Sequence, residues 1–168
     1  MKIQLKLSNI FKLIIAIAIS EGVGIIGSVF TIPSIHIWYA YLVKPALNPP
    51  AGVFGPVWTI LYAFMGVSAW VIWMKLDSDP KVGMTKKIKI ALGIFLGQLV
   101  LNTLWSIIFF GLHSPGGALV EIVLLWFAIL TTIITFYKIS KLAAWLLVPY
   151  ILWVSFALYL NYAIWLLN

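Results

Sequence analysis

Polar side chains within long apolar segments are the residues of this chain whose types and spacing could do chemistry. Five of them stand in otherwise apolar stretches: Glu21, Gln98, Asn102, Glu121 and Asn161. Placing such groups in hydrocarbon is costly, so they tend to face the interior of a helical bundle. Gln98 and Asn102 are four residues apart and share one face of a helix. The amides could contact a ligand or join helices through hydrogen bonds, and the sequence leaves both interpretations open.

The two carboxyl groups have simpler interpretations. Glu121 falls near the expected start of a helix, where the helix dipole and the membrane interface both favour a carboxylate. Glu21 falls in the middle of an apolar segment. A protonated or hydrogen-bonded carboxyl between helices explains Glu21, and contact with a ligand is the alternative.

Seven of the nine tryptophans of the chain fall into two groups. Those near the ends of apolar segments fit an aromatic belt at the membrane surface: Trp38, Trp73, Trp145 and Trp165. Three others lie deeper, and each shares a helix face with a neighbour, in the pairs Trp58 with Tyr62, Trp105 with Asn102, and Trp153 with Ala157. Such faces would suit a flat, largely apolar ligand by stacking, and ordinary aromatic packing is the alternative.

Recognised catalytic signatures are missing from the sequence. His36 and His113 fall in loops without the spacing of metal ligands, and Asp77 and Asp79 flank a solvated turn before Pro80. No nucleophile elbow, phosphate-binding loop, dinucleotide-binding glycine motif or zinc-binding helix motif occurs. The chain has no cysteine, which excludes disulfides and thiolate metal sites. We therefore expect no metal site and no required cofactor.

The composition places these residues in a membrane. Of the 168 residues, 64% are hydrophobic and 9% are charged, which is too little charge for an ordinary soluble domain. The apolar runs are continuous rather than alternating, which argues against a β-barrel. The net charge of +7 could suggest nucleic acid as a partner. However, the lysines flank the apolar segments, and membrane topology explains them better.

Five apolar segments are long enough to span a membrane as helices of about 20 residues. Their approximate bounds are 11–31, 54–74, 88–110, 117–137 and 143–167. The sequence thus predicts an all-α membrane protein, a five-helix bundle that forms one domain over residues 1–168. The first segment, which follows Lys2, Lys6 and Lys12, could instead be a signal peptide. Its apolar run is long for a signal peptide and has no small-residue cleavage site after Thr31.

The distribution of lysines predicts the orientation of the bundle. With five spans, the N-terminus and the second and fourth connections lie on one side of the membrane. That side holds ten of the eleven lysines: Lys2, Lys6, Lys12, Lys75, Lys81, Lys86, Lys87, Lys89, Lys138 and Lys141. Only Lys44 lies on the other side. The positive-inside rule then predicts a cytoplasmic N-terminus and a C-terminus outside.

The connection between the first two spans is the longest, and it is rich in proline. It contains Lys44-Pro45 and Asn48-Pro49-Pro50. Prolines remove backbone donors and bias the preceding residue away from helix. Irregular backbone beside a membrane is tolerated where protein buries it or where it lines a cavity. We therefore expect an ordered, non-helical loop that closes a pocket at one end of the bundle.

Small residues four apart suggest close helix contacts in two spans. Gly93 and Gly97 lie in the third span, and Ser20, Gly24 and Ser28 in the first. Such spacing allows two helices to approach closely. It could mark a homodimer face or tight packing within one chain, and both interpretations remain open.

Several short motifs follow one another from about Glu21 to the end of the chain. They are Trp38-Tyr39 with Leu42 and Lys44-Pro45; Asn48-Pro49-Pro50; Val53-Phe54-Gly55-Pro56-Val57-Trp58 with Leu61-Tyr62 and Met65-Gly66; Gly97-Gln98 with Leu101-Asn102, Trp105 and Phe109-Phe110-Gly111; Ala118-Leu119-Val120-Glu121; and Leu147-Val148-Pro149-Tyr150 with Trp153, Phe156-Ala157 and Leu160-Asn161. In this combination the chain resembles the translocator protein family (TspO/MBR), the tryptophan-rich sensory proteins also called peripheral-type benzodiazepine receptors.

The resemblance implies a five-helix bundle, usually a homodimer, with a pocket closed by the loop between the first two helices. It implies binding of porphyrins, including protoporphyrin IX and haem, and of synthetic isoquinoline and benzodiazepine ligands. The pocket positions of the family fall on Trp58, Tyr62, Asn102, Trp105, Trp153 and Ala157, and its loop motif falls on Trp38, Lys44, Pro45 and Pro50. Animal members also bind cholesterol through a motif that needs a basic residue after the tyrosine. No Lys or Arg follows Tyr159 or Tyr162 here, so this mode is not expected.

Three functions follow from these observations. The first is an integral membrane receptor or sensor that binds tetrapyrroles, for porphyrin transport or a stress response. The second is light-dependent porphyrin breakdown, as the resemblance implies for some bacterial members, with Trp58 and Trp153 as the tryptophans involved. The third is a porphyrin, lipid or sterol transporter, which the odd number of spans and the lack of a charged pathway disfavour. The expected partners are porphyrin or another apolar small molecule, membrane lipid and a second copy of the chain, with no nucleic acid.

Overall fold

All regular structure in the described part of the chain is helical. The computed structural model describes residues 7–78 and 82–168. The elements are α1 (Leu7–Ile37), the 3-10 helix η1 (Tyr39–Tyr41), α2 (Ala51–Ser78), α3 (Val82–Ser106), the π-helix η2 (Ile107–Gly111), α4 (Pro115–Tyr137), α5 (Lys141–Leu146) and α6 (Val148–Leu167). Among the residues considered above, Lys2, Lys6, Asp79, Pro80 and Lys81 lie outside the described ranges.

The prediction of five spans is confirmed for the described residues. Five helical segments are long and apolar enough to cross a membrane: Leu7–Ile37, Ala51–Leu76, Gly83–Gly111, Pro115–Tyr137 and Lys141–Leu167. Each begins a few residues before the segment predicted from the sequence. Hydropathy marks only the apolar stretch, whereas the helix continues into flanking residues that can sit in the interfacial region.

A break at Leu147 divides the fifth span into α5 and α6. The Leu147 N–H donates to the Ala144 carbonyl at 3.1 Å, a tighter turn than an α-helix makes, and Pro149 follows in the first turn of α6. Proline is well suited to that position, because the first N–H groups of a helix have no intrahelical partner. The apolar pattern of residues 143–167 does not reveal this break, since Leu147 and its neighbours are themselves apolar.

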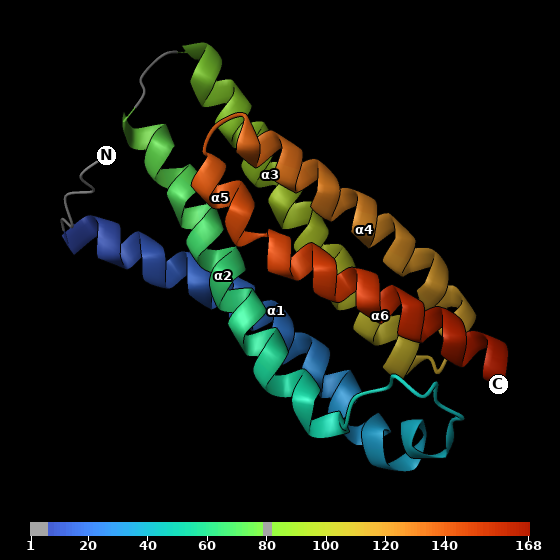
Figure 1. Cartoon of the computed structure of the whole chain (residues 1–168). Helices are drawn as coiled ribbons and strands as arrows, with labels where there is room; N and C mark the ends of the chain where they lie inside the picture. The colour runs from blue at the N-terminus through green and yellow to red at the C-terminus, as the bar shows by residue number, and fades with distance from the viewer. Residues whose placement is uncertain (1–6, 79–81) are drawn as a thin grey trace.

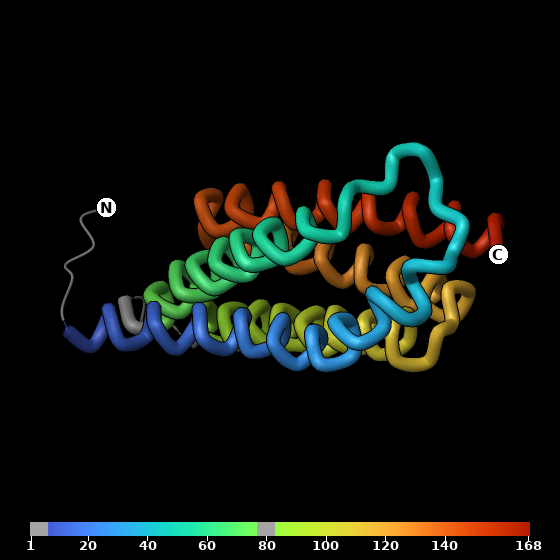
Figure 2. The backbone as a smooth tube through the Cα atoms, turned by 90° about the horizontal axis from the view of Figure 1, so that it is seen from below, coloured from blue at the N-terminus to red at the C-terminus, as the bar shows by residue number. Residues whose placement is uncertain are grey.

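The helices form a bundle with its loop and C-terminus at the same end (Figures 1 and 2). Helix α1 packs along α2, α3 and η2, and α4 packs along α3 and α6. Helix α2 packs on α5 but touches α6 only sparsely. We call the end that carries η1, residues 42–50 and the C-terminus the loop end. The start of α1 and the end of α2 lie toward the opposite end.

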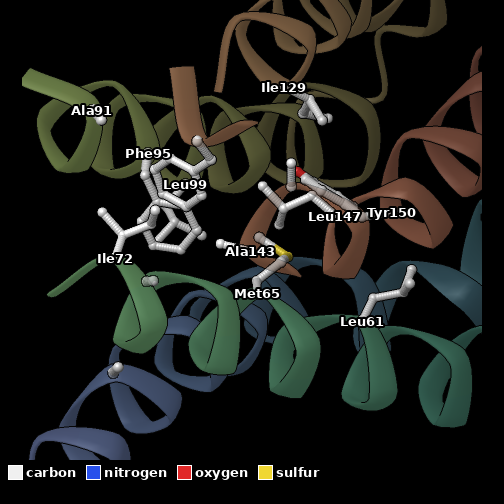
Figure 3. Packing of buried hydrophobic residues seen from close by; sticks show 14 of the residues in the cluster. Leu61, Met65, Ile72, Ala91, Phe95, Leu99, Ile129, Ala143, Leu147 and Tyr150 are labelled. Carbon is white, nitrogen blue, oxygen red and sulfur yellow. The ribbon is translucent and has the colours of Figure 1, made fainter. Parts of the chain in front are cut away.

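The core runs along the bundle between α2, α3, α4, α5 and α6 (Figure 3). Its fully buried side chains include Met65, Ile72, Leu147 and Tyr150. The Ser68 hydroxyl donates to the Ala143 carbonyl at 2.7 Å and joins α2 to α5. A second, smaller buried cluster at the loop end consists of Tyr39, Phe109, Ala118 and Ile164.

Helices α1 and α2 cross at two close contacts. At Gly66 the backbone of Ile17 comes so near that a Cβ would lie 2.6 Å from the Ile17 Cα. One turn of α2 nearer the loop end, a Cβ at Gly24 would collide with the ring of Tyr62. In α1, therefore, Gly24 of the small-residue series serves packing within the chain. Tyr62 can lie across α1 only because position 24 has no side chain.

Candidate ligand-binding site

A cavity of about 200 Å³ lies between the helices at the loop end. Four helical segments and the loop contribute to its walls. The lining residues are Gly24, Gly27, Ser28, Thr31 and Ile35 of α1; Tyr39 of η1; Ala51, Phe54, Gly55, Trp58 and Tyr62 of α2; Asn102, Trp105, Ser106, Phe109 and Phe110 of α3 and η2; and Trp153, Ala157, Leu160 and Ile164 of α6. The walls are thus mostly apolar and aromatic, with a few polar groups, as is typical of small-molecule sites.

The structure brings all six predicted pocket residues to this one cavity. Trp58 and Tyr62 come from α2, Asn102 and Trp105 from α3, and Trp153 and Ala157 from α6. Their contact with a ligand stays a prediction. The helix faces inferred from the sequence, however, do converge on a common space.

The inner end of the cavity carries a chain of buried hydrogen bonds. The Tyr62 hydroxyl donates to Asn102 Oδ1 at 2.5 Å, and Asn102 Nδ2 donates to the Tyr150 hydroxyl at 3.1 Å. The Tyr150 hydroxyl in turn donates to Gln98 Oε1 at 2.9 Å. This chain links α2, α3 and α6, so Gln98 and Asn102 do join helices, as one of the two interpretations held. The second N–H of the Asn102 amide remains available to a ligand.

Trp58 and Trp105 are both held by other aromatic rings. Trp58 stacks on Tyr62 with ring centroids 5.3 Å apart and meets Tyr150 edge-on at 6.1 Å. Trp105 stacks on Phe109 at 5.1 Å, and its Nε1 donates to Asn161 Oδ1 at 3.0 Å. These two rings are fixed before any ligand arrives, and the donor of Trp105 is already used.

Trp153 differs from Trp105 in its hydrogen bonding. Its ring meets Phe54 of α2 edge-on at 6.0 Å and Phe156 at 5.7 Å. Its Nε1 is buried and has no partner in the described part of the protein. A buried N–H without an acceptor carries a desolvation cost. The donor of Trp153, unlike that of Trp105, is therefore available to a ligand.

The π-helix η2 shapes the wall opposite α2. The Leu112 N–H donates to the Ile107 carbonyl at 2.8 Å, five residues back, which widens the helix by one residue. This turn carries Phe109 and Phe110, both of which line the cavity. The sequence gives no sign of this feature, because the segment reads as the apolar end of an ordinary helix.

The predicted loop residues are ordered, but the cavity wall uses their neighbours. Trp38 stacks on His113 at 4.5 Å, and Lys44 Nζ donates to the Ala40 and Leu42 carbonyls. Neither these two residues nor Pro45 and Pro50 are among the described residues that line the cavity. The loop-side contributors, missed from the sequence, are Tyr39 of η1 and Ala51 at the start of α2.

Tyr39 ties the loop together. Its hydroxyl donates to Asn48 Oδ1 at 2.8 Å, and Lys44 Nζ lies 4.8 Å from the centre of its ring. Burial raises the pKa of the Tyr39 hydroxyl above its ordinary value, so it remains protonated and can act as a donor at neutral pH. The Trp38-Tyr39 motif was a signal for this residue, but tyrosine at a membrane surface has a more common explanation as part of an aromatic belt.

The two carboxyl groups do not line the cavity in the described structure. Glu121 is buried in the second turn of α4, and neither of its oxygens has a hydrogen-bond partner in the described part of the chain. Glu121 therefore lies near the start of α4, as expected, with its carboxyl group buried within the bundle. Glu21 is half-buried beside Tyr62, one to two turns from Gly24 and Ser28 on α1.

The remaining predicted residues lie away from the cavity. Gly93 and Gly97 are exposed on α3, and a Cβ at either position would meet no atom within 4 Å. His36 and His113 are also exposed. Within residues 7–78 and 82–168, no group of three or more His, Cys, Asp or Glu residues could hold a metal ion.

Comparison with known proteins confirms the resemblance inferred from the sequence motifs. The sequence model of the TspO/MBR family matches residues 16–166. The "Tryptophan-rich protein TspO" of Archaeoglobus fulgidus is 43% identical over 161 residues, which cover 95% of this chain and 99% of the relative. The human "Translocator protein" is 44% identical over 76% of this chain and 73% of its own length. The "Tryptophan-rich sensory protein" of Cereibacter sphaeroides is 34% identical over 78% and 77%. The chain therefore belongs to the TspO/MBR family of integral membrane proteins.

Proposed function

We propose that this protein is a membrane receptor or sensor that binds tetrapyrroles, such as protoporphyrin IX and haem, and similar flat apolar ligands in its tryptophan-rich cavity. The observation that carries this proposal is the arrangement of Trp58, Trp105 and Trp153 around one apolar space. Flat aromatic ligands gain both apolar burial and stacking from such rings. The name "Tryptophan-rich sensory protein", given to a relative, agrees with a sensory role.

The ligand would be held mainly by stacking and by two polar contacts. Trp58 and Trp153 come from α2 and α6, and both line the cavity, so a macrocycle placed there would contact both rings. The free Trp153 Nε1 would donate to a ligand acceptor, and the remaining N–H of Asn102 would supply a second donor. No further cofactor is needed for this binding mode, because the porphyrin or haem is itself the ligand.

A titration with protoporphyrin IX tests this function. Purified protein in detergent is titrated first in the dark and then under light, while tryptophan fluorescence and the porphyrin spectrum are followed. We expect saturable quenching in the dark with an unchanged porphyrin spectrum. Absence of saturable binding would contradict the proposal and direct the search toward lipids as ligands.

The same titration separates the proposed receptor from an enzyme and a transporter. A new porphyrin spectrum that develops only under light, and is lost in the Trp58→Phe/Trp153→Phe double variant, would favour porphyrin breakdown with these rings as electron donors. Transport is tested separately in liposomes. Equal rates of porphyrin counterflow with and without the protein would exclude a transporter.

We also propose that the loop end faces outward. Lys12, Lys75, Lys86 and Lys138 lie toward the opposite end of their helices, and Lys44 lies in the loop. The positive-inside rule then places the loop and Asn168 outside the cytoplasm. A reporter enzyme that works only outside the cytoplasm should be active when fused after Asn168. Activity of a cytoplasm-specific reporter at that position would contradict this orientation.

A homodimer through α3 is the quaternary arrangement that we propose. Gly93 and Gly97 leave a shallow, unfilled strip on an exposed helix face, where a second α3 could approach closely. Gly97→Leu would fill this strip and should convert a dimer in detergent to a monomer, as measured by light scattering of the eluted protein. A monomeric native protein under the same conditions would contradict this proposal.

A further inference from the structure

We propose that the ligand enters the cavity sideways from the bilayer, through a gap between α1 and α2, and not from water past the loop. This inference rests on the proposed function and adds to it the source of the ligand, a molecule already dissolved in the membrane. It comes from the way α1 and α2 separate toward the loop end and from the contacts that hold the loop in place.

The two helices touch closely below the cavity and separate beside it. Gly66 meets the backbone of Ile17, and Gly24 meets the ring of Tyr62, as described above. Beyond this crossing, the part of α2 nearer the loop end stands away from α1, as Figure 2 shows. The residues of α1 and α2 that line the cavity begin at Gly24 and Tyr62 and continue from there toward the loop end. The cavity therefore starts where the two helices part.

Beyond Tyr62, the face of α2 that would meet α1 carries only the small residues Thr59 and Gly55. Gly55, Thr59, Tyr62 and Gly66 follow one another on the same face of α2, and the last two contact α1. Gly55 and Thr59 lie on that face too, yet both are exposed. Gly55 also lines the cavity, and a Cβ there would meet no atom within 4 Å. The cavity is thus open to the side at the position that α1 would cover if the helices stayed together.

The polar groups at the edges of the gap are satisfied by their own helices. The Ser28 hydroxyl donates to the Ile25 carbonyl at 2.7 Å, and that of Thr31 to the Gly27 carbonyl at 3.0 Å. On α2 the Thr59 hydroxyl donates to the Gly55 carbonyl at 3.1 Å. No hydroxyl at the rim therefore has to give up water or a partner when an apolar molecule passes. The gap is chemically compatible with hydrocarbon.

The loop, in contrast, is fastened at several points. Asn168 Oδ1 accepts from the Val43 N–H at 3.0 Å, and Asn168 Nδ2 donates back to the Val43 carbonyl at 3.1 Å. Trp38 stacks on His113, and Tyr39 donates to Asn48. These contacts join the loop to the end of α6, to the turn after η2 and to itself. Entry from water would have to break several of them, whereas entry through the gap breaks none.

The size of the cavity leads to the same conclusion. Its volume of about 200 Å³ is below the range of about 300–1,000 Å³ that is typical of sites for drug-sized molecules. A tetrapyrrole cannot be enclosed in it completely. The part that does not fit needs an opening lined by apolar groups, and the α1–α2 gap is continuous with the cavity at Gly55.

Blocking the gap tests this route through rates rather than affinity. In Thr59→Trp a large ring would stand in the gap outside the cavity lining. Protoporphyrin IX is supplied in donor vesicles to protein in liposomes, and binding and release are followed by quenching of tryptophan fluorescence. We expect association and dissociation both to slow by tenfold or more while the dissociation constant changes less than threefold, because an obstructed path slows both directions equally.

Two controls make the result specific. Ile60→Trp adds the same ring at the next position of α2, which faces away from α1 and is exposed, and it should leave both rates unchanged. Because the chain has no cysteine, Val43→Cys/Asn168→Cys creates a single pair that can be bridged to lock the loop. Locking should also leave both rates unchanged. If Thr59→Trp does not fold, as judged by circular dichroism and gel filtration, Thr59→Leu should slow both rates by a smaller factor.

The outcomes separate the route from the proposed function. Unchanged rates in the folded Thr59 variants, or association that stops when the loop is locked, would overturn the membrane route while binding itself stands. Absence of saturable binding in the native protein would instead overturn the proposed function. Slowing in Thr59→Trp with native rates in Ile60→Trp and in the locked loop would establish entry from the bilayer.

Discussion

Replacing Gly66 with alanine is expected to lower the free energy of unfolding by about 1–3 kcal/mol, the usual range for overpacking a filled site. The added Cβ would lie 2.6 Å from the Ile17 Cα and 2.9 Å from the Ile17 N. These are backbone atoms, which cannot rotate away as the end of a side chain can. Helix α1 would have to shift, and with it the residues of α1 that line the cavity.

A matched control separates this clash from the general effect of removing a helical glycine. Gly22→Ala places the same methyl group on α1 where no atom lies within 4 Å. Alanine is favoured over glycine in helices by up to about 1 kcal/mol, so this variant should be neutral or slightly more stable. Unfolding of both proteins in mixed micelles of increasing denaturing-detergent content, followed by circular dichroism, measures the difference. Equal stability of the two variants would show that α1 does not press on α2 at Gly66.

The path of the chain was largely predictable from hydropathy and charge. The five apolar segments predicted the five spans. Backbone polar groups cannot be left unpaired in a bilayer, and a long apolar segment pairs them all by forming a helix. Local hydrogen bonding that the apolar pattern does not encode was not predictable. The break at Leu147 and the π-turn from Ile107 to Gly111 both lie in stretches of uniformly apolar residues.

The candidate site was predictable in part, for two different reasons. Trp58 with Tyr62 and Trp153 with Ala157 follow from helical spacing, and family resemblance selected these faces over others. The roles of Tyr39 and Tyr150 were missed because they depend on which helices lie opposite, and one sequence does not specify that. The different hydrogen bonding of Trp105 and Trp153 likewise could not be predicted from the sequence. Asn161 of α6 accepts a hydrogen bond from Trp105, whereas no described group accepts one from Trp153.

Replacing Trp153 with leucine is expected to weaken the binding of protoporphyrin IX by about 100-fold. Stacking of a flat ring on an aromatic side chain is worth about 1–3 kcal/mol, and the lost Nε1 donor adds about 0.5–1.5 kcal/mol for one hydrogen bond. Trp153→Phe keeps an aromatic ring and removes only the donor, so its affinity should fall by about tenfold or less. Quenching titrations in the dark measure both values.

The effects of replacing Trp153 and Trp58 on affinity and on stability distinguish ligand contact from structural support. Trp153 makes no hydrogen bond in the described structure, so its replacement should weaken binding more than it lowers stability. Trp58, in contrast, stacks on Tyr62, which belongs to the buried hydrogen-bond chain. Trp58→Phe should therefore lower both affinity and thermal stability. Trp145→Phe, at an exposed position of α5, should change neither. Native affinity in both Trp58→Leu and Trp153→Leu would remove stacking in this cavity as the mode of binding, since no other pair of lining tryptophans joins α2 to α6.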